Sequence, residues 1–395
     1  MIGKYRLNIY DSFTGALTYT VEDFQQVTFG QLVNGVTSCT IQLHGQHGVI
    51  PYLTTNALIE VWRQIPGHLP AAVPTLRQRT DNWYVEWAGL FTDINSHTIY
   101  SNGNDVYVGT AYNLIDLLQR REILWYATDV DSESKKTAIP AQTAIYEFVE
   151  ENLGASATAV AGRIFDGTMT GLVVPLLIGS GPNWTGSRAW RNVLETIQEI
   201  ALYGSIDFDV SSQPGGTFVF ETYPDQLGRD RTTIGLDPTT GLNAAGYPPV
   251  IFDLMLNNVS QMTYSHRRSN SCNLVVTTGQ GQYTGRAVGT AIDMTDIDGR
   301  RLNQREMTRN ANTQDDAASL VTLAEEWLSR GGAVEDLDFV PYLTPSTLYG
   351  VHFWLGDRVT ARFAGQEYHK RLSSVNLTVD RKGETFSSWK FETIP

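Results

Sequence analysis

The sequence predicts an α+β protein that is mainly β, and three observations support this class. Short runs of β-branched and aromatic residues, separated by turn residues, fill residues 4 to 110. Helical periodicity replaces them between about 111 and 250, and strand-like runs return from Asn258 onward. With 395 residues the chain is also too long for one ordinary hydrophobic core, so we expect two or three domains.

Residues 1–111 are expected to form the first β domain, either a barrel or a sandwich. Asn102-Gly103 marks a hairpin turn. Residues 65–80 read "IPGHLPAAVPTLRQRT", in which three prolines prevent a strand ladder. We therefore expect a long exposed loop, and its Arg77 and Arg79 are candidates for contact with a partner.

Residues 112–255 are expected to form a mixed helical and β domain with three helices. The first begins at Tyr112 and buries Leu114, Ile115, Leu117 and Leu118. The second has Pro140 at its start and ends before Gly154, and the third runs from an N-cap at Ser187 to a stop at Gly204. After it, "SIDFDVSSQPGGTFVFETY" predicts a strand, a Gly-Gly turn and a second strand.

Residues 256–395 are expected to form a second β domain with one inserted helix at about 313–331. That helix has Thr313 as its predicted N-cap and stops at Gly331. In the stretch "HFWLGDRVTARF", Gly356 permits a turn with positive φ and Asp357 can accept hydrogen bonds from nearby backbone N–H groups. These two residues are therefore candidates for a structural role at the start of the strand Arg358 to Phe363.

The net charge of −13 argues against a surface that binds nucleic acid through lysine and arginine. An acidic channel wall would instead let a polyanion pass without binding it. The two cysteines, Cys39 and Cys272, lie in separate strand-like runs and are expected to be buried free thiols rather than a disulfide. The N-terminus reads as a strand and not as a secretory signal, so folding in a cytoplasm is expected. The most apolar segment, Gly171 to Gly179, is too short to span a bilayer, so we expect no membrane insertion.

Motifs for metal or cofactor chemistry fail on their spacing, so we expect no metal, no cofactor and no enzymatic activity. His44 and His47 lack further zinc ligands and read as a polar turn, and residues 293–301 misplace the acids that a calcium loop needs. The glycine-rich run after Cys272 lacks a P-loop lysine and reads as a wide hairpin turn, and "GSGPN" does not complete a nucleophile elbow.

Paired carboxylates for glycoside hydrolysis depend on distances in space, so the sequence leaves that chemistry open. The acids that could serve are on a strand or on a helix, where a solvated face explains them equally well. They are Asp207, Asp209, Glu147, Glu150 and Glu151.

Several segments, in their order and spacing, resemble the baseplate hub or tail-tip family of siphoviruses, the long-tailed bacteriophages. They are "NLIDLLQRREILW", "WRNVLETIQEIALYGSIDFDV", "FVFETYPDQLGRDRTT", "NVSQMTYSHRRSNSCNLVVTTG" and "WLGDRVTARF". The resemblance covers nearly the whole chain and includes no catalytic signature.

This resemblance implies two tail-tube-like β-barrel domains separated by the mixed α/β insert. It implies a homotrimer at the tail tip of the virion that caps the distal end of the tail tube and continues the DNA conduit, with no specific DNA binding. Its implied partners are the distal tail protein ring, the tail tube protein, the tape measure protein and tail fibre or receptor-binding proteins. The alternative from another class is a glycan-active β protein, either a receptor-binding module or a polysaccharide hydrolase.

Overall fold

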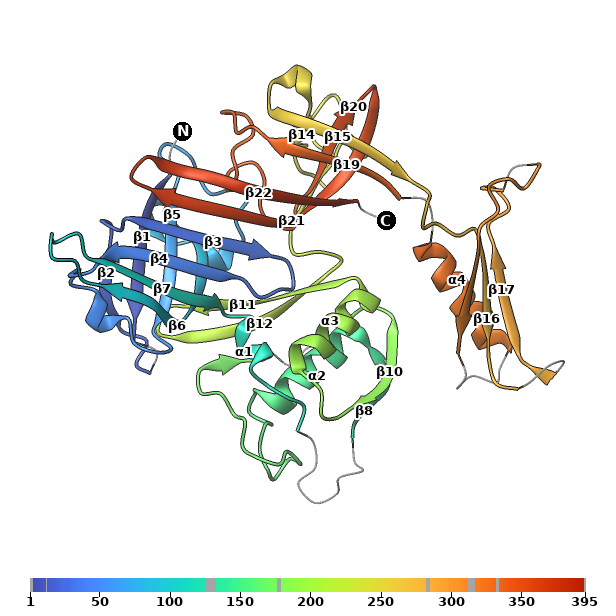
Figure 1. Ribbon diagram of the computed structural model, residues 1–395, viewed down its shortest axis with the longest axis horizontal. Coiled ribbons are helices and arrows are strands. Elements are labelled where there is room, and N and C mark those ends of the chain that lie inside the picture. Colours follow the sequence, from blue (N-terminus) through green and yellow to red (C-terminus); the bar gives the residue numbers. More distant parts are fainter. Residues whose placement is uncertain are drawn as a thin grey trace. The chain divides into compact units, whose positions relative to one another are not determined.

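The computed structural model describes residues 3–11, 13–124, 133–175, 179–281, 285–297, 299–311, 317–331 and 334–393. The chain divides into two compact units, one formed by Met1–Gln261 with Val340–Pro395 and the other by Met262–Phe339. Strands dominate the first unit, and helices occupy only short parts of it (Figure 1). The mainly β class predicted from the sequence is confirmed.

A twelve-stranded sheet forms the body of the first unit (Figure 1). Its main path runs in the order β13-β20-β21-β3-β4-β7-β6-β5-β1-β2, while β14 also pairs with β20 and β22 with β21. The strands from the first part of the chain are β1 (Lys4–Tyr10), β2 (Leu17–Val21), β3 (Gln26–Leu32), β4 (Ser38–His44), β5 (Leu58–Gln64), β6 (Tyr84–Thr98) and β7 (Val106–Asn113). The others are β13 (Asp230–Arg231), β14 (Ile251–Phe252), β20 (Arg358–Phe363), β21 (Gln366–Asp380) and β22 (Gly383–Thr393).

Alternation of apolar and polar residues sets which face of each strand is buried. In β4, Cys39, Ile41 and Leu43 are buried while the residues between them are partly exposed. These side chains join a core that also takes in Leu377 and Val379 of β21. Residues from both ends of the sequence therefore share one hydrophobic core.

The pairing of β3 with β21 is antiparallel and runs from Leu32↔Ser374 to Gln26↔Asp380. We call this pairing the seam, because it joins the first strands of the chain to the last ones in one sheet. β21 is long enough to pair with β20 through its first residues and with β3 through its last ones, while β22 covers its other edge. Within the described residues the pairings run from β2 to β13 and β14 without closing, so the expected closed barrels are not seen there.

Helices and two small sheets make up the middle of the first unit. The helices are α1 (Asp116–Gln119), α2 (Ala141–Asn152) and α3 (Val193–Gly204), with 3-10 turns η1 (Ile50–Tyr52), η2 (Thr75–Arg77), η3 (Thr80–Asn82) and η4 (Leu254–Leu256) elsewhere in this unit. One sheet pairs β8 (Ser134–Pro140) with β10 (Asn183–Arg188), and the other has the order β11-β12-β9, with β9 (Leu172–Val173), β11 (Ile206–Gln213) and β12 (Thr217–Pro224). The buried faces of α2 and α3 pack with β11 and β12 in a second core.

The second predicted helix and the strand-turn-strand of this region are confirmed. Pro140 precedes α2, and the turn between β11 and β12 contains Gly215 and Gly216 at positive φ. Such φ values suit glycine, which lacks the Cβ that would clash. The strand ladder between β11 and β12 is continuous from Ile206↔Pro224 to Gln213↔Thr217.

Two helix predictions were wrong at their starts. The segment from Tyr112 continues β7 to Asn113, because Tyr112 pairs with Ser38 and with Leu90, and only the four-residue α1 follows. The four apolar residues predicted for its buried face are nevertheless buried: Leu114, Ile115, Leu117 and Leu118.

The N-cap of α3 is Asn192 and not Ser187. The Asn192 side chain accepts hydrogen bonds from the backbone N–H groups of Leu194 and Glu195, which is ordinary capping geometry. Ser187 lies instead in β10, paired with Lys135 of β8. Strand pairing therefore uses the residues that the sequence pattern had assigned to the first turn of the helix.

The second unit contains a three-stranded sheet and one helix. The sheet has the order β17-β16-β18, with β16 (Leu274–Thr278), β17 (Val288–Ile292) and β18 (Glu306–Asn310), and α4 (Ala317–Arg330) packs on β17 and β16. Strands β15 (Val259–Arg267) and β19 (Val334–Pro341) pair with each other. The antiparallel pairing of β16 with β17 confirms the wide hairpin, and the predicted cap Thr313 lies outside the described residues.

Three smaller expectations can be compared with the fold. Gly103 has a positive φ in the turn between β6 and β7, as the Asn-Gly pair predicted. Cys39 and Cys272 are both buried free thiols, also as predicted. Across the described ranges, the helices lack the length and apolar character that crossing a bilayer requires.

Candidate functional site: buried ion pairs in the first unit

A cluster of buried polar side chains lies in the large sheet near the seam. Its centre is Arg63 on β5, which is 1% exposed. The other members come from β1, β3, β6, β22 and the segment before β20. The Arg63 cluster consists of Tyr5, Gln31, Arg63, Tyr84, Glu86, Tyr349 and Glu384.

Arg63 uses its guanidinium to connect strands that are far apart in sequence. Its Nη2 lies 2.9 Å from Oε2 of Glu384 on β22, and its Nη1 lies 3.5 Å from Oε2 of Glu86 on β6. Nη1 also donates to the Tyr84 hydroxyl at 2.8 Å and to the Tyr349 carbonyl at 3.1 Å. A buried charge needs such partners, because burial without them is costly.

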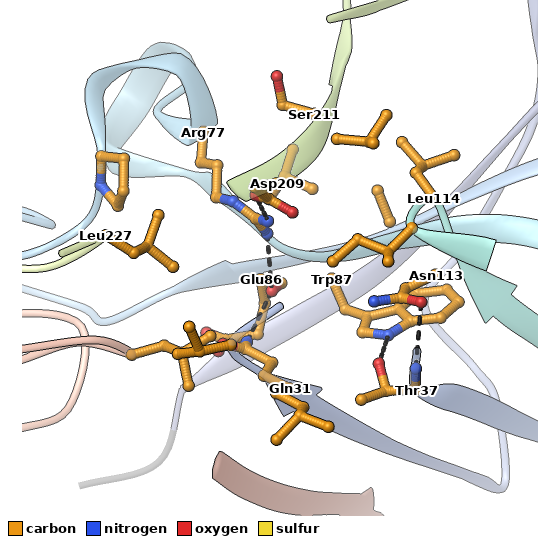
Figure 2. A pocket seen from close by; sticks show the side chains of 18 of the residues that line it. Gln31, Thr37, Arg77, Glu86, Trp87, Asn113, Leu114, Asp209, Ser211 and Leu227 are labelled. Atoms are coloured by element: carbon orange, nitrogen blue, oxygen red, sulfur yellow. Dashed lines mark hydrogen bonds and ion pairs between the residues drawn. The ribbon is translucent and has the colours of Figure 1, made fainter. Parts of the chain in front are cut away.

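Gln31 on β3 ties the seam to this cluster. Its side-chain amide donates to the Glu86 carbonyl at 2.7 Å and to Oε1 of Glu86 at 2.6 Å, as Figure 2 shows for this region. Its side-chain oxygen accepts a hydrogen bond from the Tyr349 hydroxyl at 3.0 Å. The cluster thus links β3, β6 and the segment that leads to β20.

Electrostatics in the Arg63 cluster is dominated by burial. Burial raises the pKa of Glu86 above its ordinary value, although Arg63 acts in the opposite direction. Burial likewise raises the pKa of Tyr5, Tyr84 and Tyr349 well above 10. These phenols therefore remain neutral hydrogen-bond donors, and one guanidinium faces two carboxylates.

Arg77 and Arg79 lie closer to the rest of the chain than the sequence indicated. Arg77, in η2, pairs with Asp209 of β11 at 2.5 Å, an ion pair drawn in Figure 2. Arg79 lies 3.7 Å from a Glu60 carboxylate oxygen and donates to the Ser212 carbonyl at 3.2 Å. Acids of β11 and β5 therefore hold both arginines within this chain, with 21% and 11% of their side chains exposed, and their contact with a partner stays a prediction.

Gly356 and Asp357 lie directly before β20. Gly356 has φ +87°, and an added Cβ would lie 2.7 Å from the Gly228 nitrogen. The Asp357 carboxylate accepts hydrogen bonds from the backbone N–H of Arg229 at 2.5 Å and of Trp354 at 2.9 Å, and Arg231 pairs with it at 3.2 Å. Burial raises the pKa of Asp357 to about 6 in spite of these partners.

The space enclosed near these groups is small. A cavity of about 40 Å³ is lined by Gln31, Arg77, Glu86 and Asp209 together with apolar side chains such as Trp87 (Figure 2). That volume has room for a few water molecules and not for a substrate. The arrangement is suited to joining strands rather than to turning over a ligand.

The other sequence candidates are held by partners within the chain. Asp207 forms an ion pair with Arg371, and Glu151 forms one with Lys136. His47 pairs with Asp23 at 2.8 Å. In the described ranges no group of three or more His, Cys, Asp or Glu side chains is placed to hold a metal ion.

The sequence analysis missed Arg63, Glu86 and Glu384. A signal for two of them was present, because "LIEVWRQ" and "YVEWAGLF" each carry charged residues inside runs that otherwise read as buried strands. A charge in such a run indicates a buried partner. The identity of that partner could not be read from the sequence, since Glu384 is 321 residues from Arg63.

Comparison with solved structures identifies the class to which this fold belongs. The chain is similar to the tail protein from Neisseria meningitidis MC58, with 12% identity, a TM-score of 0.52 and coverage of 96% of this chain and 94% of that chain. It is also similar to the 43 kDa tail protein of prophage MuSo2 from Shewanella oneidensis, with 11% identity, a TM-score of 0.54 and coverage of 96% and 95%. The fold is therefore that of phage tail proteins.

The family is shown by the sequence itself. The model of the siphovirus ReqiPepy6 Gp37-like protein family matches residues 6–391, and the chain belongs to this family. The resemblance to proteins of long-tailed phages is thereby confirmed. No curated protein matches the chain by sequence.

Proposed function

We propose that this protein is a structural component of the virion, the tail hub that caps the distal end of the phage tail tube. The observation that carries the proposal is the phage tail protein fold, shared over nearly the whole chain, in a member of a siphovirus family. In this role the protein organises the tail tip for host attachment and genome ejection. Its work is assembly, and it requires no catalytic residue.

The open sheet supports a ring of three copies. In the described residues the main path of the sheet ends at β2 on one side and at β13 and β14 on the other, and β22 pairs only with β21, so strand pairing within one chain leaves open edges. Closed rotational symmetry would let neighbouring copies cover such ends. We propose a homotrimer in which each copy contributes two tube-type β regions, residues 1–111 and 256–395, on either side of the mixed insert 112–255.

The net charge of −13 supports a conduit for DNA. A channel wall of the same sign as the phosphates lets DNA slide through without specific binding. The proposed partners are the distal tail protein ring, the tail tube protein, the tape measure protein and tail fibre or receptor-binding proteins. The residues of the 65–80 loop that remain exposed, such as Leu69 and Leu76, are candidates for one of these contacts.

Mass measurement of the purified protein, alone and mixed with its tail partners, tests the proposal directly. We expect a species of three copies, and we expect density for the chain at the tail tip in a map of the intact virion. A chain that stays monomeric with every tail partner and is absent from virions would refute the hub assignment.

The hydrolase form of the alternative receives no support from the acids considered for it. Asp207 and Asp209 are each paired with an arginine, and Glu147 and Glu151 flank Lys136. A general acid and a nucleophile need a substrate-sized space between them. An assay of wall or capsule hydrolysis by the isolated chain should therefore show no activity that one Asp or Glu substitution abolishes.

A further inference from the structure

Trp190 has an unusual backbone conformation for a large exposed residue. Its φ is +56°, in the left-handed region that bulky side chains rarely adopt, and the residue is 51% exposed. Strain of this kind persists only where neighbouring structure enforces it, and it is concentrated at functional sites. The hydrophobic effect alone would not place an indole in solvent at this cost.

Backbone hydrogen bonds on both sides hold Trp190 in place. Its N–H donates to the Ile123 carbonyl at 2.9 Å, and the Ile123 N–H donates to the Arg191 carbonyl at 2.8 Å. The Val193 N–H then donates to the Arg121 carbonyl at 3.0 Å at the start of α3. The backbone that carries the indole is therefore fixed before any ligand arrives.

Trp190 lines a solvent-open groove of about 670 Å³ in the first unit. This volume is in the usual range for small-molecule sites. Leu32 and Val36 give the groove an apolar part. Its polar lining consists of Gln119, Glu122, Arg191, Asn192, Glu195 and Gln198.

The polar groups of the groove retain capacity for hydrogen bonds. Among the described residues, the side chains of Gln119 and Glu195 have no hydrogen-bond partner. Glu122 receives one hydrogen bond, at 3.3 Å from the Asn192 amide. Gln198 donates through its amide to the Asn34 carbonyl, which leaves its side-chain oxygen available.

We propose that this groove binds a neutral oligosaccharide, with Trp190 as the stacking platform. A pyranose ring has one face of C–H groups, which packs on an indole, and a rim of hydroxyls, which bind amides and carboxylates. The two lining carboxylates disfavour an acidic sugar, since the one lining guanidinium, Arg191, lies 3.4 Å from Glu199. This binding activity is independent of the hub role.

A contact with another protein is the competing explanation, because exposed tryptophans are also frequent in interfaces. The centre of a protein interface is depleted of glutamate, whereas the two carboxylates of Glu122 and Glu195 line this groove beside the indole. The observations therefore favour the sugar. The protein contact is one outcome of the test.

The test uses the full chain and two neutral probes, cellotetraose and tetra-N-acetylchitotetraose, with binding followed by saturation-transfer NMR and calorimetry. We expect the native protein to bind at least one of them and Trp190→Ala to weaken binding at least about tenfold. The matched control is Tyr203→Ala. Tyr203 is an aromatic residue of α3 that is 52% exposed and lies outside the lining of the groove, so its removal should leave sugar binding unchanged.

Trp190→Gly separates a binding role from a packing role. Glycine adopts positive φ freely, so we expect this variant to lose sugar binding while its melting temperature stays equal to that of the native protein or rises. Absence of binding of both probes by the native protein overturns the proposal. So does a marked fall in melting temperature for Trp190→Gly, or a Trp190→Ala variant that keeps sugar binding but loses assembly with tail partners.

Discussion

Replacing Arg63 with methionine tests whether the Arg63 cluster stabilises the first unit. Methionine keeps most of the side-chain volume but removes the guanidinium that faces Glu86 and Glu384. It also removes the hydrogen bonds to the Tyr84 hydroxyl and the Tyr349 carbonyl. Two carboxylates then remain in the interior without their cation.

The expected loss is large. Removing one partner of a buried ion pair costs about 3–5 kcal/mol, chiefly because the other charge stays buried. A typical domain is stable by only about 5–15 kcal/mol, so this substitution should remove a substantial part of the total. Arg362→Met is the matched control, because Arg362 and its partner Glu367 are 41% and 38% exposed and such surface pairs contribute at most about 1 kcal/mol.

The pH dependence gives an independent check on the cause. The pKa of Glu86 is already raised by burial, and loss of Arg63 raises it further. At pH values above about 4.5 the folded variant therefore still holds a proton that the unfolded chain, with an ordinary glutamate pKa near 4.5, has already released. The deficit of the variant should therefore shrink as the pH falls from 8 towards 5.

Urea unfolding followed by tryptophan fluorescence at pH 8 and pH 5.5 provides the measurement. The triple variant in which Glu86 and Glu384 are also replaced with glutamine should recover stability at pH 8, because no buried charge is then left unpaired. The reasoning fails if Arg63→Met unfolds at the same urea concentration as Arg362→Met. It also fails if the deficit is the same at both pH values.

Three further predictions follow from other parts of the fold. Gly356→Ala should lower the urea midpoint of unfolding more than Gly365→Ala. Both glycines have positive φ, but of the two only Gly356 has backbone atoms within 3 Å of an added Cβ. Equal losses of stability would contradict a role for that contact. In mild denaturant Cys272 should react with a thiol reagent before Cys39, because the second unit has the smaller core. Peptide mass measurement shows which cysteine is labelled first, and earlier labelling of Cys39 would contradict this prediction. The pKa of Asp357 is raised to about 6, so between pH 4 and pH 6 the folded chain holds a proton that the unfolded chain has largely released. This difference should lower the free energy of unfolding by about 2 kcal/mol from pH 4 to pH 7. Asp357→Asn should remove that part of the pH dependence, and an unchanged slope in unfolding midpoints would show that Asp357 is not its source.

Local features of the fold could be predicted from the sequence because their causes are local. The turn at Gly215-Gly216 and the positive φ of Gly356 follow from the absence of a Cβ. The limits of α2 follow from Pro140 and from the buried face of the helix. Each of these signals lies within a few residues of the structure it specifies.

The helix starts that were wrong show how tertiary contacts override local preference. Ser187 and Asn192 are both good capping residues, and the pairing of β10 with β8 decides between them. Tyr112 has helical periodicity after it, yet its pairing with β4 and β6 keeps it in a strand. No window of the sequence contains the partner strands that make this choice.

The candidate site could not be predicted from the sequence for the same reason. Arg77 could be recognised as a candidate for pairing, but its partner Asp209 is 132 residues away. The partners of Arg63 come from three separate parts of the chain. The strained backbone of Trp190 likewise depends on its hydrogen bond to Ile123, which only the fold brings close.

The seam between β3 and β21 has a consequence for synthesis of the protein. The hydroxyls of Thr28 and Thr378, which are 350 residues apart in the sequence, form a hydrogen bond across this pairing. One edge of β3 therefore has no partner until nearly all of the chain has left the ribosome. Closing so long a loop is slow, and an open strand edge invites pairing with other chains. Completion of the sheet therefore waits for synthesis of β21, and a chain that ends before β21 leaves this edge of β3 unpaired.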